Sequence, residues 1–202
     1  MTVQLRFGLA DAVVPVHLDD IAAGAQATAQ SVLGRFDEPV DRAEATELEG
    51  TFRALAELLV ASEADLGFAI VPAPPLIGIF GAIVVRWREA VGDDALELAV
   101  DESLSTGGFT LEQPVIAQVD TPLGTATRVN HRWAADPGAS SLSGRVKADL
   151  AVTDQLVWYW RIEDPAGRDA ILTVTSITTD LARTPIANPI VDAFAEAITF
   201  DS

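Results

Sequence analysis

The chain has 202 residues, and its 30 acidic and 13 basic side chains give a formal net charge of -17 at neutral pH. This charge repels phosphate backbones and anionic lipid headgroups, so we expect neither nucleic acid nor a membrane as partner. Hydrophobic residues make up 49% and charged residues 21%, which indicates a packed globule, and the length suits a single domain over residues 1–202. The chain has no cysteine, which excludes disulfides, thiolate nucleophiles and cysteine-ligated metals.

The beginning of the chain is expected to form two short strands, from Val3 to Phe7 and from Val13 to His17. It lacks the basic stretch, apolar core and cleavage site of a signal peptide, so we expect a cytoplasmic protein. Asp19 or Asp20 is suited to cap a helix that ends at about Leu33.

A second helix is expected from about Arg42 to Ala61. Its apolar residues recur at helical spacing and form one face. These residues are Leu48, Phe52, Leu55, Leu58 and Leu59. The opposite face is acidic and is either a solvated surface or a docking face for a basic protein partner.

The segment from Leu66 to Val85 is an uncharged run of twenty residues, which is about the length that spans a bilayer. Three prolines between residues 72 and 75 would break a helix there and leave backbone groups unsatisfied in lipid. We therefore expect two strands, Leu66–Val71 and Leu76–Arg88, joined by a proline turn. The second strand is apolar on both faces, which indicates a central place in a covered sheet.

The remainder of the chain reads as two further hairpins and a closing helix, after a short helix near Ala95 to Ser105. The paired strands are Pro114–Val119 with Thr125–Trp133 and Leu150–Ile162 with Ala170–Ile177, and a flexible loop is expected at Asp136–Gly144. Asn188 is a good N-cap for the closing helix, and Pro189 suits its first position. The expected fold is α+β: a mainly antiparallel sheet of six or more strands built from hairpins, with N-terminal and C-terminal helices packed on one face.

The end of the chain carries a family resemblance. An apolar strand from Val157 leads through the turn Asp164-Pro-Ala-Gly167 to a strand with a Ser/Thr-rich end, Ile171–Asp180, and then to a Phe-containing helix, Ile190–Phe200. Over these residues the chain resembles a group of actinobacterial proteins that share an α+β fold similar to PsbP-like domains. The resemblance implies that fold and carries no catalytic residue.

The sequence shows no constellation of catalytic or metal-binding residues. The two histidines, His17 and His131, lie on different predicted strands, and no Ser or Thr is locally paired with a base. His17 with Asp19 and Asp20 could hold a metal, but a turn from strand to helix places Asp there as a cap. We therefore expect no metal, no cofactor and no catalytic residue, and the sequence favours a non-enzymatic protein.

The most distinctive segment is Trp158-Tyr-Trp160, which Arg161 follows. Strand alternation places the two tryptophans on one face and Tyr159 with Arg161 on the other. Aromatic residues on an antiparallel strand mostly pack in the core, and a ligand pocket is the alternative. The residues that would line such a pocket are His131, Arg132, Arg128, Trp133, Trp158, Tyr159, Trp160 and Arg161.

Two functions remain open. The first is a non-enzymatic intracellular binding or adaptor domain that recognises a protein through the acidic helix. The alternative is a small-molecule-binding protein or enzyme with a pocket between the sheet and its helices. A cleft that gathers Trp133, Trp158 or Trp160 with His131 and an arginine would favour the alternative, whereas a flat surface would favour the adaptor.

Overall fold

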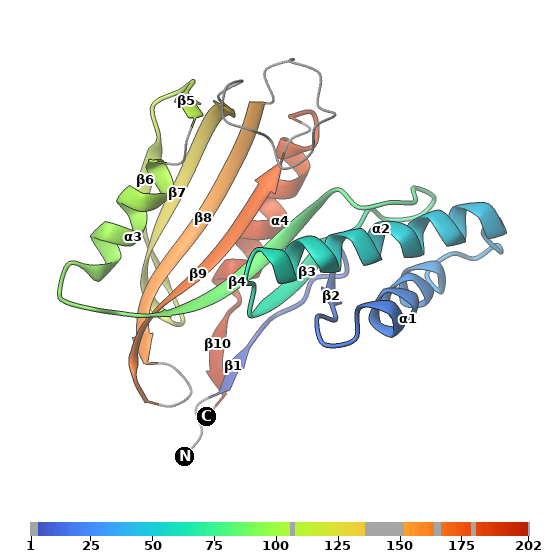
Figure 1. Cartoon of the computed structure of the whole chain (residues 1–202), viewed down its shortest axis with the longest axis horizontal. Helices are drawn as coiled ribbons and strands as arrows, with labels where there is room; N and C mark the ends of the chain where they lie inside the picture. The colour runs from blue at the N-terminus through green and yellow to red at the C-terminus, as the bar shows by residue number, and fades with distance from the viewer. Residues whose placement is uncertain (1–3, 106–107, 136–151, 164–166, 179–180, 202) are drawn as a thin grey trace.

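The computed structural model describes residues 4–105, 108–135, 152–163, 167–178 and 181–201. It confirms an α+β protein with a mainly antiparallel sheet of more than six strands (Figure 1). Within the described residues the elements in chain order are β1 (Gln4–Arg6), β2 (Val13–Val16), α1 (Ile21–Leu33), α2 (Arg42–Ala61), β3 (Leu66–Ile70), β4 (Gly81–Glu89), α3 (Ala95–Leu104), β5 (Gly108–Thr110), β6 (Val115–Thr121), β7 (Gly124–Ala135), β8 (Val152–Glu163), β9 (Asp169–Thr178), α4 (Thr184–Glu196) and β10 (Thr199–Asp201).

The main sheet has eight strands among the described residues, with the order β2, β3, β4, β9, β8, β7 and then β5. Strand β6 also pairs with β7, next to β5 along the same edge. Neighbouring strands run antiparallel throughout. Strands β1 and β10 form a separate two-stranded sheet, which brings the two ends of the described chain together.

Helix α4 covers one face of the main sheet. Its buried residues Val191 and Phe194 belong to the largest apolar cluster, together with side chains from the central strands. The strand residues beneath it include Phe68, Ile70, Ile83, Val85, Leu156, Trp158, Trp160, Leu172 and Val174. They come from alternate positions of four strands, as one face of a sheet requires.

Helices α1, α2 and α3 cover the opposite face. Helices α1 and α2 pack over β2 and β3, and α3 packs over β7, β8 and β9 (Figure 1). Phe68 belongs to the cluster under α4, whereas its neighbour Ala69 belongs to the cluster under α2. Since successive strand residues point to opposite faces, the N-terminal and C-terminal helices lie on opposite sides of the sheet. The expectation that they share one face is wrong, because strands such as β3 are apolar on both sides and both sides need cover.

Several boundaries differ from the sequence prediction, and two elements begin about five residues away from their predicted starts. Helix α4 begins at Thr184, so Pro185 takes the place near its start that the prediction gave to Pro189, and Pro189 lies inside the helix. Strand β4 begins at Gly81 and not at Leu76, because the preceding segment includes Gly78 at a φ of +136°, which does not continue a strand. The predicted loop Asp136–Gly144 lies outside the described residues.

In the part of the chain that the structure describes, no helix is both long enough and apolar enough to cross a membrane.

Candidate ligand-binding groove

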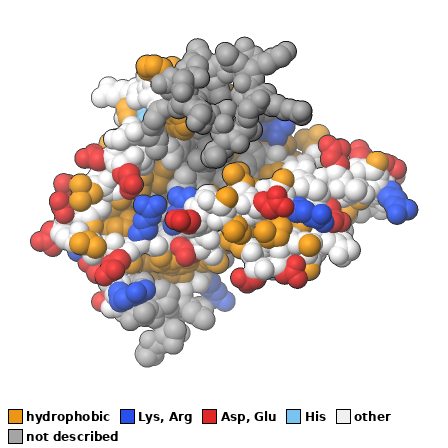
Figure 2. All heavy atoms as spheres, in the orientation of Figure 1, with side chains coloured by type: hydrophobic (Ala, Val, Ile, Leu, Met, Phe, Trp, Pro, Cys, Tyr) orange, Lys and Arg blue, Asp and Glu red, His pale blue; other side chains and the backbone are white. Residues whose placement is uncertain are grey.

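A groove of about 960 Å³ lies on the face of the sheet that carries α2 and α3. Strands are spaced by about 4.8 Å and a helix is about 10 Å wide, so one helix covers only part of a wide sheet. Helix α2 lies toward one edge of the sheet and α3 toward the other, and parts of β4, β9 and β8 line the groove between them. Figure 2 looks onto this face and shows hydrophobic side chains exposed on α2 and in the hollow between the two helices.

The walls of the groove are mainly apolar. On α2 they are formed by Leu55, Leu58 and Leu59, and on α3 by Ala95, Leu98 and Ala99. Leu58 is 65% exposed and Leu98 is 56% exposed, so both carry apolar surface to water at the rim. Burial of such surface is worth about 25 cal/mol per Å², which makes the groove favourable for an apolar occupant.

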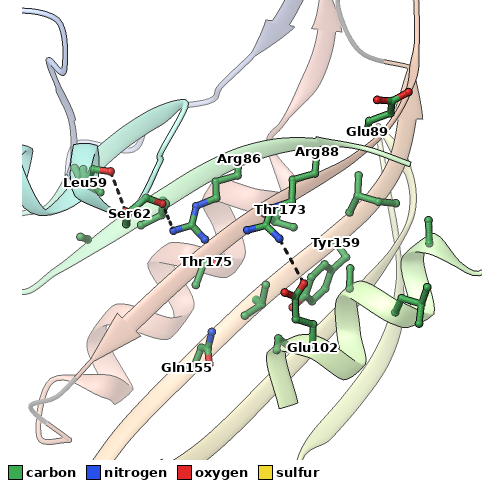
Figure 3. A pocket seen from close by; sticks show the side chains of 18 of the residues that line it. Leu59, Ser62, Arg86, Arg88, Glu89, Glu102, Gln155, Tyr159, Thr173 and Thr175 are labelled. Atoms are coloured by element: carbon green, nitrogen blue, oxygen red, sulfur yellow. Dashed lines mark hydrogen bonds and ion pairs between the residues drawn. The ribbon is translucent and has the colours of Figure 1, made fainter. Parts of the chain in front are cut away.

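The floor is built from side chains of β4, β9 and β8 that stand in register. Val84, Thr175 and Val157 form one cross-strand row. The next row lies two positions away along each strand and consists of Arg86, Thr173 and Tyr159. The floor therefore carries a polar row beside a largely apolar one, between apolar walls (Figure 3).

Arg86 holds the central positive charge of the groove. Its Nη2 donates to the backbone carbonyl of Ser62, at the C-terminal end of α2, over 2.6 Å. Its Nε is buried without a partner, and no carboxylate of the described residues pairs with it. The helix end thus fixes the position of the guanidinium, and its partial negative charge offsets only part of the positive charge.

Arg88 and the carboxylates occupy the rim. Arg88 pairs with Glu102 of α3 at 3.4 Å, and both side chains are largely exposed, so the pair is weak. Glu89 also lines the groove at the end of β4 and points away from Arg86 in Figure 3. Because Arg88 pairs with Glu102, Arg86 and Glu89 are the two charged groove residues without an ion-pair partner among the described residues.

Tyr159 closes the polar row on the α3 side. Burial raises its pKa above the usual range, and a hydrogen bond with the side chain of Ser103 partly opposes that shift. The phenol therefore stays protonated at neutral pH. Of the eight residues predicted to line a pocket, Tyr159 is the one found among the described lining residues.

The predicted tryptophan pocket does not form, because Trp158 and Trp160 lie on the opposite face under α4. They are buried and stacked on one another, with ring centroids 5.7 Å apart. Arg128 lies above Trp158 and forms two hydrogen bonds with Asp192 of α4. These three predicted site residues therefore have packing partners and face no groove.

The remaining predicted residues are engaged elsewhere. Arg132 pairs with Asp154 at 2.7 Å and also with Glu112, while Arg161 pairs with Asp169. His131 is buried, its Nε2 lies 3.2 Å from the hydroxyl of Thr110, and burial lowers its pKa. Trp133 is partly buried on the same strand, β7, and its Nε1 has no hydrogen-bond partner.

The sequence analysis missed Arg86, Thr173 and Thr175. A signal for them was present, since Arg86 and Arg88 stand two positions apart in an apolar strand, and Thr173 and Thr175 alternate with Leu172 and Val174. Alternation alone places each pair on one face. It does not show that these faces of β4 and β9 lie side by side and line an open groove.

No model of a known protein family matches the chain, and no curated protein matches it. Within the described ranges no group of three or more His, Asp or Glu side chains is placed to hold a metal ion.

Proposed function

We propose that the protein is a binding protein that holds a small, largely apolar molecule in the groove between α2 and α3. The observation that carries the proposal is the combination of a volume of about 960 Å³ with leucine walls and a polar row in the floor. Small-molecule sites are typically concave, about 300 to 1,000 Å³ in volume and mainly apolar, with a few polar groups that orient the ligand.

The groove favours a small-molecule ligand over the adaptor function. An adaptor was expected to use the acidic face of α2, but the opposite side of that helix supplies Leu55, Leu58 and Leu59 to a concave surface. A small molecule fits between the two helices, whereas the acidic face offers charge alone. The acidic face then serves to keep a protein with exposed leucines in solution.

We assign binding and no reaction to the groove. Its described lining residues include no histidine, and of its two carboxylates Glu102 is paired with Arg88. Nucleophilic or acid-base catalysis needs a reactive side chain held next to a base or acid. The groove supports orientation of a ligand through Arg86, Thr173 and Tyr159.

The test is binding of Nile red, a neutral apolar dye whose fluorescence rises in an apolar site. We expect saturable binding to the wild-type protein. Ala99→Trp places an indole in the groove from the α3 wall and should abolish this binding. Ala54→Trp is the matched control, because Ala54 is exposed on α2 and is not among the lining residues. Equal dye binding by both variants would show that the dye sits elsewhere and would overturn the proposal.

Two sequence-based expectations stand as further proposals. We propose kinship with the actinobacterial proteins of PsbP-like fold that residues 157–200 resemble, and the α+β architecture is compatible with it. We also propose a cytoplasmic location. Fractionation of the native host tests the location, and a solved structure of a member of that group tests the kinship.

A further inference from the structure

We infer that the ligand of the groove is an anionic amphiphile: an aliphatic chain or ring system with a carboxylate headgroup, bound with that headgroup at Arg86. This inference rests on the proposed function, because it names the chemical class of the molecule that the groove holds. The argument depends on the state of the Arg86 guanidinium and on the polar groups beside it.

Arg86 is held in place but has unused donors. One nitrogen, Nη2, donates to the carbonyl of Ser62, while Nε and Nη1 have no hydrogen-bond partner among the described residues. A partly buried cation without a counter-charge is unfavourable, and a ligand carboxylate would provide both the charge and the missing acceptors. The guanidinium is suited to this because it presents its donors in a planar fork that matches a carboxylate.

Five other arginines of the described chain differ from Arg86 in this respect. Arg53, Arg88, Arg128, Arg132 and Arg161 each pair with a carboxylate of the protein. The protein carries 30 acidic residues, so an internal partner for a groove arginine would be easily supplied. Among the described arginines that line the groove, Arg86 is the one without such a partner.

The floor adds hydroxyl groups next to this charge. Thr173 stands directly opposite Arg86 in the sheet, and Thr175 is two positions further along β9. No hydrogen bond of either side chain is found among the described residues, and both are partly exposed on the groove floor. A hydroxyl can donate to a carboxylate oxygen, so the headgroup would meet Arg86 and Thr173 together.

The apolar part of the ligand would then lie between the leucine walls. Leu55 and Leu59 on α2 face Leu98 and Ala99 on α3 across the groove, and Val84 and Val157 form the floor next to the polar row. An ammonium headgroup at the same place would meet the positive charge of Arg86. The groove should therefore rank ligands of equal chain length as carboxylate first, alcohol second and quaternary ammonium last.

The experiment compares dodecanoate, dodecanol and dodecyltrimethylammonium, each by displacement of Nile red below its micelle concentration. For the wild-type protein we expect dodecanoate to bind about tenfold more tightly than dodecanol, as a charge-assisted hydrogen bond implies. Arg86→Gln should remove this tenfold preference and leave the affinity for dodecanol unchanged. Arg86→Lys should keep part of the preference.

Arg35→Gln is the matched control, because Arg35 also donates to a backbone carbonyl, that of Asp11, but lies outside the groove. It should leave all three affinities unchanged. If Arg86→Gln does not fold, the inference is still tested by the ranking of the three ligands on the wild-type protein and on Arg86→Lys. Equal affinity of the wild type for dodecanoate and dodecanol would overturn the inference while Nile red binding upholds the groove. Failure of every probe, Nile red included, would overturn the proposed function itself.

Discussion

Asp192 of α4 accepts two hydrogen bonds from Arg128 of β7, over 2.8 and 2.9 Å, and a third from the indole of Trp158. This is the charged link between the closing helix and the sheet. Only 21% of the Arg128 side chain and 28% of the Asp192 side chain are exposed, so water screens the pair weakly. The bond to Asp192 raises the pKa of Arg128, which therefore stays charged.

We expect Asp192→Ala to lower the free energy of unfolding by about 1 to 3 kcal/mol, because it leaves a partly buried guanidinium and an indole N–H without their acceptor. Urea unfolding measures the loss. Asp101→Ala is the control, since Asp101 is exposed on α3 and its side chain makes no hydrogen bond or ion pair with the described residues. The link would be unimportant if both variants unfolded at the same urea concentration.

The pKa of Tyr159 reports on the polar row of the groove and can be measured directly, because Tyr159 is the only tyrosine of the chain. Burial raises its pKa above the ordinary 10.0, so the phenolate absorbance should appear at higher pH than in a free tyrosine. The hydrogen bond between the side chains of Tyr159 and Ser103 lowers the same pKa, so Ser103→Ala should raise it further. Ser105→Ala, at the exposed end of α3, should leave it unchanged. An ultraviolet titration of the three proteins checks the order, and an ordinary pKa in the wild type would contradict the burial.

Much of the secondary structure follows from local patterns. Helix α2 has the predicted bounds, Arg42–Ala61, because its apolar residues recur at a strict helical spacing. The alternation in β8 correctly separated Trp158 and Trp160 from Tyr159, since period-two alternation is a property of the strand itself. The bounds of α2 and the alternation in β8 both depend only on residues that are close together in the sequence.

The groove could not be predicted in the same way. It depends on the pairing of β4 with β9, two strands that are far apart in the sequence. It also depends on the positions at which α2 and α3 pack on the sheet. A strand that is apolar on both faces shows that both are covered, but not which helix covers which face. The predicted pocket failed for this reason: Trp158 is conspicuous in the sequence, yet α4 fills the space above it.

His131 should make stability depend on pH. Burial lowers its pKa, so the folded protein holds a neutral imidazole that the unfolded chain protonates more readily. Its contribution to stability is therefore complete above the ordinary pKa of 6.5 and is lost progressively as the pH falls below that value.

We expect His131→Gln to show a smaller drop in melting temperature between pH 7.5 and pH 5.5 than the wild type, because glutamine does not titrate. Glutamine can still hydrogen-bond the hydroxyl of Thr110, which limits the direct cost of the substitution. His17→Gln is the control, since His17 is exposed. Identical pH dependence in the wild type and His131→Gln would show that burial of this imidazole has no such effect.

Phe194 makes the closing helix part of the core. Its side chain is 1% exposed, and its ring lies 4.9 Å from that of Phe68 and 5.7 Å from that of Phe7. It thus joins α4 to β3 and to the segment after β1. Phe194→Ala should lower the free energy of unfolding by about 3 to 5 kcal/mol, the sum of lost burial and the cavity left behind. Because a domain's net stability is about 5 to 15 kcal/mol, the urea midpoint should fall markedly.

Ile186→Ala is the matched control, since it also shortens an apolar side chain on α4, but at a position that is 51% exposed. Its effect should stay within about 0.5 kcal/mol, as for most surface substitutions. If Phe194→Ala unfolded at the same urea concentration as Ile186→Ala, α4 would be peripheral. The packing of its Val191 and Phe194 against the sheet would then contribute little to holding the fold together.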